Sequence, residues 1–184
     1  MIIGAALSLY TLPKLGIEAN LITAAAASAG ALIPDIDHPG SKINQIMLPM
    51  KNRLGKMIIY SGLGGVLLYK ASSLHSTLSF LGLILIIIGL SHHRSFTHSI
   101  PSAISLSIIS FMFFQNYFSN NLIYAFIIGI LSHLIGDFLT KQGIELFYPI
   151  TDKNYRFPIN ISSGGIIEYI ISFILVFAIV KSIF

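Results

Sequence analysis

Charged residues in this chain are confined to short intervals between long apolar segments, and this pattern constrains the fold more than any other feature. Only 10% of the 184 residues are charged, whereas an ordinary soluble domain carries about 25%. A helix needs about 20 mostly apolar residues to cross a bilayer, and fewer where flanking side chains reach the interface. The sequence therefore predicts an all-α fold, a polytopic transmembrane helical bundle of about six to seven helices, forming a single integral-membrane domain over residues 1–184.

The candidate membrane spans are apolar stretches, the first of them short. They lie at residues 2–12, 17–33, 55–70, 75–91, 100–118, 121–140 and 164–183. The second stretch is rich in Ala and Gly, which allows helices to approach closely. The chain contains no cysteine, so disulfides, thiolate metal sites and a cysteine nucleophile are excluded.

Most histidines and carboxylates fall in four short clusters at or near the ends of these predicted spans. The clusters are Asp35–His38 between two prolines, the segment His92–His98, the pair His133 and Asp137, and Glu168. Successive spans cross a bilayer in alternating directions, and this alternation brings all four clusters to the same side. We therefore expect one polar site at one membrane face.

Basic residues are divided unevenly between the two sides. Lys14, Lys70 and Lys181 lie away from the clusters, and the others lie on the cluster side: Lys42, Lys51, Arg53, Lys56, Arg94, Lys141, Lys153 and Arg156. An excess of Lys and Arg marks the cytoplasmic side. The sequence thus predicts a multi-pass protein of the cell membrane with its site on the cytoplasmic face. A nucleic-acid-binding protein would carry a basic stripe on a soluble face. The basic residues here lie between apolar spans instead, so we expect no nucleic-acid partner.

The segment Asp35–His38 offers three metal ligands within four residues. Pro34 and Pro39 disfavour helical backbone across it. Carboxylates suit hard ions and imidazole suits zinc, so the mixture fits Zn²⁺, Mn²⁺ or Fe²⁺. The alternative is an acidic turn that only caps helices.

His133 and Asp137 are four residues apart on a predicted helix, so their side chains share one face. Ionisable groups inside a span are costly and normally face the bundle interior or a cavity. The pair can chelate one divalent ion. The alternative is a hydrogen-bonded polar pair that joins helices.

The other two clusters suggest phosphate binding and acid–base chemistry. Arg94, among the histidines of its segment, has a planar guanidinium suited to phosphate oxygens, although it could simply fix the topology. Thr97 and Ser99 are candidate caps of the next helix. Glu168 is a candidate ligand, general base or partner of a ligating histidine. It could instead be a glutamate that the dipole favours near a helix start.

Three motifs make the chain resemble a known family of membrane proteins. They are Leu32-Ile33-Pro34-Asp35-Ile36-Asp37-His38-Pro39-Gly40-Ser41, His93-Arg94-Ser95-Phe96-Thr97-His98-Ser99, and Ser132-His133-Leu134-Ile135-Gly136-Asp137 with Thr140 and Gly143. From about residue 30 onward the chain resembles the YdjM-type (DUF457) proteins, described as membrane-bound metal-dependent hydrolases, and Glu168 after a Ser-Gly stretch fits this resemblance. The family is distantly similar to zinc-dependent phospholipase C and to zinc nucleases, which cleave phosphoesters. Its members often carry a further histidine near the N-terminus, and this sequence has none before His38.

Motifs and resemblance together predict a membrane-embedded metal-dependent hydrolase. Its expected substrate is a phosphoester of a lipid or amphiphile, with membrane lipid as partner and zinc as the first choice of one or two ions. The predicted metal ligands are Asp35, Asp37, His38, His93, His98, His133 and Asp137. More than four good ligands favours a two-metal site. The predicted catalytic residues are Arg94, to hold phosphate, and Glu168 or a spare carboxylate such as Asp37, to act as base.

The alternative class is a non-enzymatic membrane protein: a transporter, or an ion-binding or partner-binding scaffold that keeps a degenerate metal site. Polar residues inside spans also mark ion pathways, and the missing early histidine favours the scaffold. A transporter places its polar groups near mid-membrane, where helices break. Here the clusters lie at span ends beside loops, which favours an enzyme.

Overall fold

The computed structural model describes residues 10–18, 20–38, 40–50, 52–71, 77–92 and 95–158, and a few positions from 165 to 177. In this part of the chain the regular elements are all helices, and an isolated bridge pairs Ile144 with Tyr155. The α-helices are α2 (Leu21–Leu32), α3 (Lys42–Met47), α4 (Arg53–Lys70), α5 (Thr77–Leu90), α6 (Ile100–Phe114) and α7 (Asn120–Phe138). Three 3-10 helices accompany them: η1 (Pro13–Leu15), η2 (Pro34–Asp37) and η3 (Phe96–His98).

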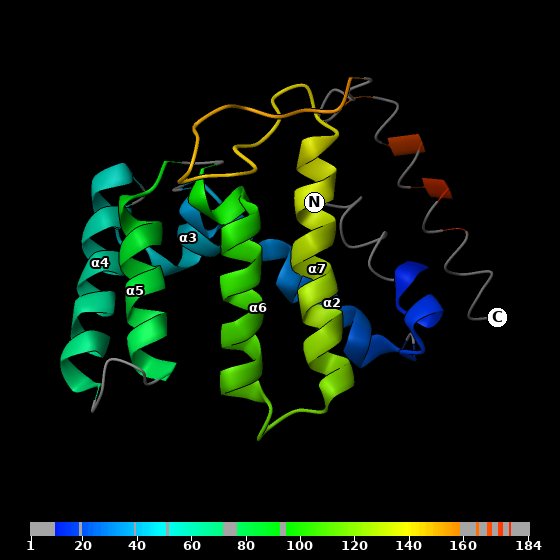
Figure 1. The fold of residues 1–184 in the computed structure, drawn as a ribbon, viewed down its shortest axis with the longest axis horizontal. Helices are drawn as coiled ribbons and strands as arrows, with labels where there is room; N and C mark the ends of the chain where they lie inside the picture. The colour runs from blue at the N-terminus through cyan, green and yellow to red at the C-terminus, as the bar shows by residue number, and fades with distance from the viewer. Residues whose placement is uncertain are drawn as a thin grey trace.

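The long helices lie side by side, and the chain reverses direction at each connection from α4 to α7 (Figure 1). α4 packs along α5, α2 packs along α7, and α6 stands between the two pairs. As a result η2, η3 and the last turns of α7 meet at one end of the bundle, which is the upper end in Figure 1. The predicted convergence of the Asp35, His98 and His133 clusters is therefore confirmed.

Helix boundaries follow from local capping. Asn20 and Thr23 form a reciprocal capping box, with the Asn20 side chain accepting from the Thr23 amide at 2.9 Å and Thr23 Oγ1 accepting from the Asn20 amide at 3.0 Å. This box starts α2 at Leu21, four residues later than the sequence predicts. Ser99 caps α6 as predicted, accepting from the Ser102 amide at 3.3 Å.

Glycines let the paired helices approach until their backbones touch. A Cβ on Gly30 would collide with the carbonyl of Phe126, and one on Gly129 would collide with the carbonyl of Ala27. These two positions fix α2 against α7 in the manner of small-residue contacts between membrane helices. Gly64 plays the same part between α4 and α5, because a Cβ there would lie 2.5 Å from the carbonyl of Gly82.

The predicted helices at 17–33, 55–70, 75–91, 100–118 and 121–140 are present with shifted ends. The short helix α3 was not expected, because six residues give too little periodicity to detect. Most of the predicted segments 2–12 and 164–183 lie outside the described residues. Among the described helices, α7 has the length and hydropathy to cross a membrane, and α5 and α6 are shorter apolar helices.

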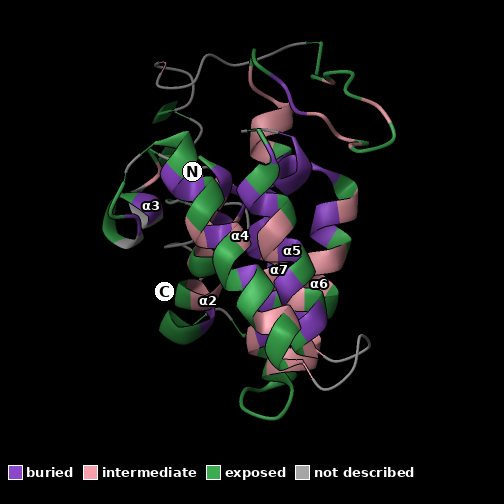
Figure 2. Cartoon of the chain, turned by 90° about the vertical axis from the view of Figure 1, so that its left-hand side faces the viewer, coloured by how far each residue is buried: buried purple, intermediate pink, exposed green. Residues whose placement is uncertain are grey.

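The outer surface of the bundle is strongly apolar. Exposed residues run along the outer face of α4, where Leu63, Val66 and Tyr69 are 48%, 52% and 91% exposed (Figure 2). α5, α6 and α7 also expose large aliphatic side chains. Soluble monomers rarely show contiguous apolar surfaces of this extent, so the bundle body is suited to contact with acyl chains.

Candidate metal centre

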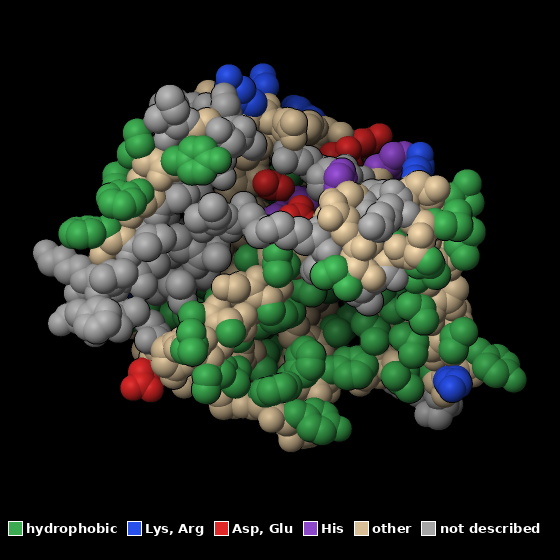
Figure 3. Space-filling model, turned by 180° about the vertical axis from the view of Figure 1, so that it is seen from behind, with side chains coloured by type: hydrophobic (Ala, Val, Ile, Leu, Met, Phe, Trp, Pro, Cys, Tyr) green, Lys and Arg blue, Asp and Glu red, His purple; other side chains and the backbone are tan. Residues whose placement is uncertain are grey.

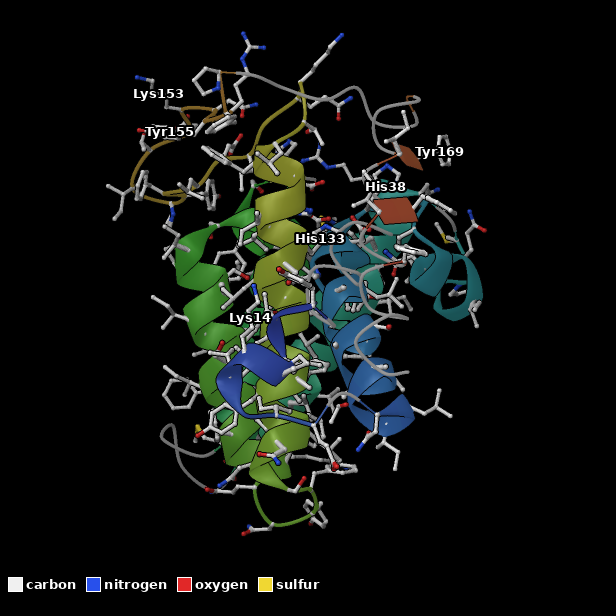
Figure 4. The ribbon with its side chains drawn as sticks, turned by 90° about the vertical axis from the view of Figure 1, so that its right-hand side faces the viewer. Lys14, His38, His133, Lys153, Tyr155 and Tyr169 are labelled. Carbon is white, nitrogen blue, oxygen red and sulfur yellow. The ribbon has the colours of Figure 1, made fainter. Side chains whose placement is uncertain are left out.

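The candidate site is assembled from three segments that are far apart in the sequence. η2 supplies Asp35 and Asp37, η3 supplies His98, and the last two turns of α7 supply His133 and Asp137. Figure 4 shows His133 high on α7, between this helix and the end of α2. Pro34 opens η2 directly after α2, and this short helix turns Asp35 toward the two histidines.

Four ligand-type atoms gather at this point. His98 Nε2 lies 3.3 Å from His133 Nε2 and 3.1 Å from Asp137 Oδ2. Asp35 Oδ1 lies 3.8 Å from His98 Nε2 and 3.6 Å from His133 Nε2. Asp137 Oδ2 also lies 3.5 Å from His133 Nε2. Both carboxylates thus adjoin the two imidazoles, and the ligand atoms of Asp35, His98 and His133 all lie within 4.8 Å of one another.

These distances fit a small divalent ion. In a tetrahedral zinc site with bonds of about 2.0–2.1 Å, neighbouring ligand atoms stand about 3.3 Å apart. The separations here range from 3.1 to 3.8 Å. Nitrogen and carboxylate donors without sulfur suit Zn²⁺ and also Mn²⁺ or Fe²⁺. The residues present therefore fit a divalent metal, with Asp35, His98 and His133 as the core set.

The charges around the metal-free site determine which of its groups bind protons. Burial opposes protonation of His98, but hydrogen bonds to Asp137 and Asp35 and the negative charges of Asp37 and Asp137 outweigh it and raise the pKa of His98 to about 9. Burial also favours the neutral form of Asp35, but the imidazoles of His98 and His133 outweigh it and lower the pKa of Asp35. A positive charge is thus stabilised at the centre.

Asp37 occupies a different place from Asp35. It is fully buried on the Nδ1 side of His98, with Oδ2 at 3.8 Å from that nitrogen. Thr97 bridges them, because its hydroxyl donates to Asp37 Oδ2 at 2.5 Å and lies 3.0 Å from His98 Nδ1. Carboxylates and hydroxyls behind a ligating histidine commonly fix its orientation. The sequence suggested only a capping role for Thr97, and its hydroxyl in fact contacts the site.

A second buried network holds η2 in position, and sequence reasoning missed it. The Asn44 amide donates to the carbonyls of Ile36 and His38, both at 2.7 Å. Tyr60 on α4 donates its hydroxyl to Asn44 Oδ1 at 2.6 Å. Asn44 is 0% exposed and Tyr60 is 2% exposed. The sequence does show that Ser41 can cap a helix that contains Asn44. It gives no sign that the Asn44 side chain turns back to bind η2.

Lys56 is the other residue that the sequence did not single out. It is 1% exposed, and its Nζ donates to the carbonyl of Ser91 at the end of α5, at 2.6 Å. Its charge also interacts with that of Asp37. A cation at the carboxyl end of a helix is favoured by the helix dipole, so Lys56 ties α4 to the end of α5 beside the site.

Of the remaining predicted residues, only His38 lies in the part of the chain that the structure describes. His38 is exposed, and its backbone carbonyl is what Asn44 binds. His93, Arg94 and Glu168 lie outside the described residues.

The fold and the site define a class of protein: a helical, membrane-type protein with a buried histidine–carboxylate centre suited to a divalent metal. Residues 1–183 match the sequence model of the YdjM inner membrane protein family, and the chain belongs to this family. It is also 28% identical to the uncharacterized protein YvsG of Bacillus subtilis (strain 168) over 151 residues, covering 82% of this chain and 71% of that protein. No solved structure matches the chain.

Proposed function

We propose that the protein is a membrane-embedded, metal-dependent hydrolase that cleaves a phosphoester of a lipid or amphiphile. The observation that carries this proposal is the convergence of Asp35, His98 and His133, with Asp137 beside them, at distances suited to one divalent ion. A divalent ion held there would supply Lewis acidity, polarising a phosphoryl oxygen and acidifying a water molecule.

The roles of base, phosphate-binding residue and further ligand are assigned to residues of the chain. If Asp35, His98 and His133 hold the ion, Asp137 lies beside both histidines and is the candidate base. The Asp35 side chain is 30% exposed whereas that of His98 is 0% exposed, so substrate approaches from the Asp35 side. Arg94 is proposed to hold the phosphate. Glu168 is proposed as a further base, and Asp37 is proposed to hold the orientation of His98 from behind. His38 and His93 are proposed as ligands of a second ion.

Placement at a membrane face is the second part of the proposal. The charged and histidine side chains gather toward one end of the molecule, above a body of hydrophobic side chains (Figure 3). The described basic residues at this end include Arg53, Lys56, Lys141, Lys153 and Arg156. This excess is typical of the cytoplasmic side. We propose a multi-pass protein whose site lies at headgroup depth on that side.

The test is turnover by detergent-purified, metal-loaded protein. The substrates are phosphatidic acid in mixed micelles and p-nitrophenyl phosphate as a soluble phosphoester. Release of phosphate that needs Zn²⁺ or Mn²⁺ and is lost in Asp137→Asn supports the proposal. Metal binding without turnover of either substrate contradicts it.

A structural metal site is the second candidate, and one observation favours it. Four protein ligands around one zinc ion leave no open position, as in structural sites, and Asp137 lies close enough to be the fourth. In that case metal would raise the unfolding temperature, and Asp137→Asn would lower it without any activity to lose.

A further inference from the structure

We propose that Lys56 is a buried counter-charge that offsets Asp37 behind His98 and thereby weakens the binding of the ion at the metal centre. The inference rests on the metal centre of the proposed function. It adds a residue that sets how tightly the ion is held, and this residue lies outside the sequence motifs that supply the ligands.

Two contacts place Lys56 at the end of the bundle where the site lies. Its Nζ donates to the carbonyl of Ser91 at 2.6 Å. One turn further along α4, Tyr60 belongs to the buried cluster against which Ile36 of η2 packs. Residues four apart on a helix share a face, and Ile36 directly precedes Asp37. The packing of η2 therefore brings Asp37 to the face of α4 that carries Lys56.

The carboxylate of Asp37 and the ammonium of Lys56 are both removed from water. Asp37 is 0% exposed and Lys56 is 1% exposed, and their charges interact. A buried charge is costly without a compensating charge nearby. On its other side Asp37 accepts from the Thr97 hydroxyl and lies 3.8 Å from His98 Nδ1. Asp37 thus stands between the charge of Lys56 and an imidazole of the metal centre.

The charges of the described residues around the centre balance a divalent ion. Asp35 and Asp137, beside the imidazoles, together neutralise such an ion. Asp37 adds a further negative charge, and Lys56 cancels it. Without Lys56 the surroundings of the ion would be more negative. They would bind a cation more tightly and leave it less able to polarise a phosphoryl oxygen.

The sign of the effect separates this role from a merely structural one. A unit charge about 10 Å from the ion changes a binding constant about tenfold at the effective dielectric constant of protein sites. Removing the charge of Lys56 should therefore strengthen metal binding. Damage to the packing around the site should weaken it.

The experiment measures the zinc affinity of the full chain, purified in detergent, by competition with a zinc indicator at one pH and one ionic strength. We expect Lys56→Met to bind zinc about tenfold more tightly than the wild type, and Asp37→Asn about tenfold more weakly. Lys56→Met/Asp37→Asn removes both charges and should lie within about threefold of the wild type. Lys70→Met is the control, because Lys70 is exposed at the far end of α4, and it should leave the affinity unchanged.

Weaker or unchanged zinc binding by Lys56→Met overturns the proposal. If this variant does not fold, the double variant is compared with Asp37→Asn and should bind zinc about tenfold more tightly. Equal or weaker binding in that comparison also overturns the proposal.

Hydrolysis of p-nitrophenyl phosphate is measured on the same samples after saturation with zinc. Affinities that do not follow the charges while turnover persists defeat this inference alone. Affinities that follow the charges without turnover support the inference and contradict the proposed function. Wild-type protein that binds no zinc defeats both.

Discussion

The Nε2 atoms of His98 and His133 face each other 3.3 Å apart, although 35 residues separate them in the sequence. At this separation one imidazole can donate its N–H to the lone pair of the other, or both lone pairs can face one metal ion. Asp35 and Asp137 lie on either side and add negative charge. The site therefore stabilises a cation at one point, supplied by a proton in the free protein and by a metal ion when one binds.

Removing both histidines is expected to remove the metal. Elemental analysis of wild-type protein should give about one or two equivalents of zinc or manganese, and His98→Ala/His133→Ala should give none. His92→Ala is the control, because His92 is exposed at the same end of the bundle. Equal metal content in all three proteins would show that these imidazoles bind no ion.

Asp137→Asn is expected to weaken metal binding while leaving the helices intact. The amide keeps the shape of the side chain and removes the charge beside both histidines. The loss of affinity should reach about 10–100-fold, measured by competition with a zinc indicator, and circular dichroism should not change. Asp152→Asn, in the exposed loop after α7, should retain wild-type affinity. Full turnover by Asp137→Asn would exclude a catalytic role.

Metal affinity is expected to rise with pH. The pKa of His98 is raised to about 9 in the metal-free fold, so below that pH an incoming ion must displace its proton. Affinity should therefore increase about tenfold per pH unit between pH 7 and 9 and level off above. Zinc titrations in weakly buffered solution at pH 7 should also release about one proton per ion. A pH-independent affinity would argue against His98 as a ligand.

Asn44→Ala is expected to destabilise the fold and weaken the site together. It leaves the carbonyls of Ile36 and His38 and the hydroxyl of Tyr60 without the partner they have now. The expected loss is about 3 kcal/mol of unfolding free energy, with lower zinc affinity because η2 carries Asp35.

Tyr60→Phe is the matched control for Asn44→Ala. It removes one hydrogen bond to Asn44 and should cost about 1 kcal/mol, with zinc affinity nearly unchanged. Unfolding in detergent, followed by circular dichroism, measures both variants. Equal effects on zinc affinity would show that Asn44 does not act through η2.

Gly129→Ala and Gly136→Ala, seven residues apart on α7, should have opposite effects. A Cβ on Gly129 collides with the Ala27 carbonyl, whereas one on Gly136 meets nothing within 4 Å. The first variant should lose about 1–3 kcal/mol, and the second should gain up to about 1 kcal/mol from helix propensity. Thermal unfolding measures both, and a stable Gly129→Ala would show that α2 and α7 are not in direct contact.

The amino-acid sequence determined the helices and the end of the bundle where the site lies. Apolar runs bounded by charges located α2, α4, α5, α6 and α7, because burial and backbone hydrogen bonding act within each segment. Alternation of direction then placed Asp35, His98 and His133 together. The spacing of His133 and Asp137 put both on one helix face, as the structure shows.

Only the tertiary structure decided which of the clustered residues share a centre. Asp35 and Asp37 are two residues apart, yet η2 turns one toward the histidines and the other behind His98. The direction of each carboxylate depends on the carbonyls that Asn44 binds and on the hydroxyl of Thr97. These contacts join distant segments, and the buried Lys56 and Tyr60 depend in the same way on how α4 meets its neighbours. Local sequence patterns carry no signal for them, because their energy comes from partners that only folding brings within reach.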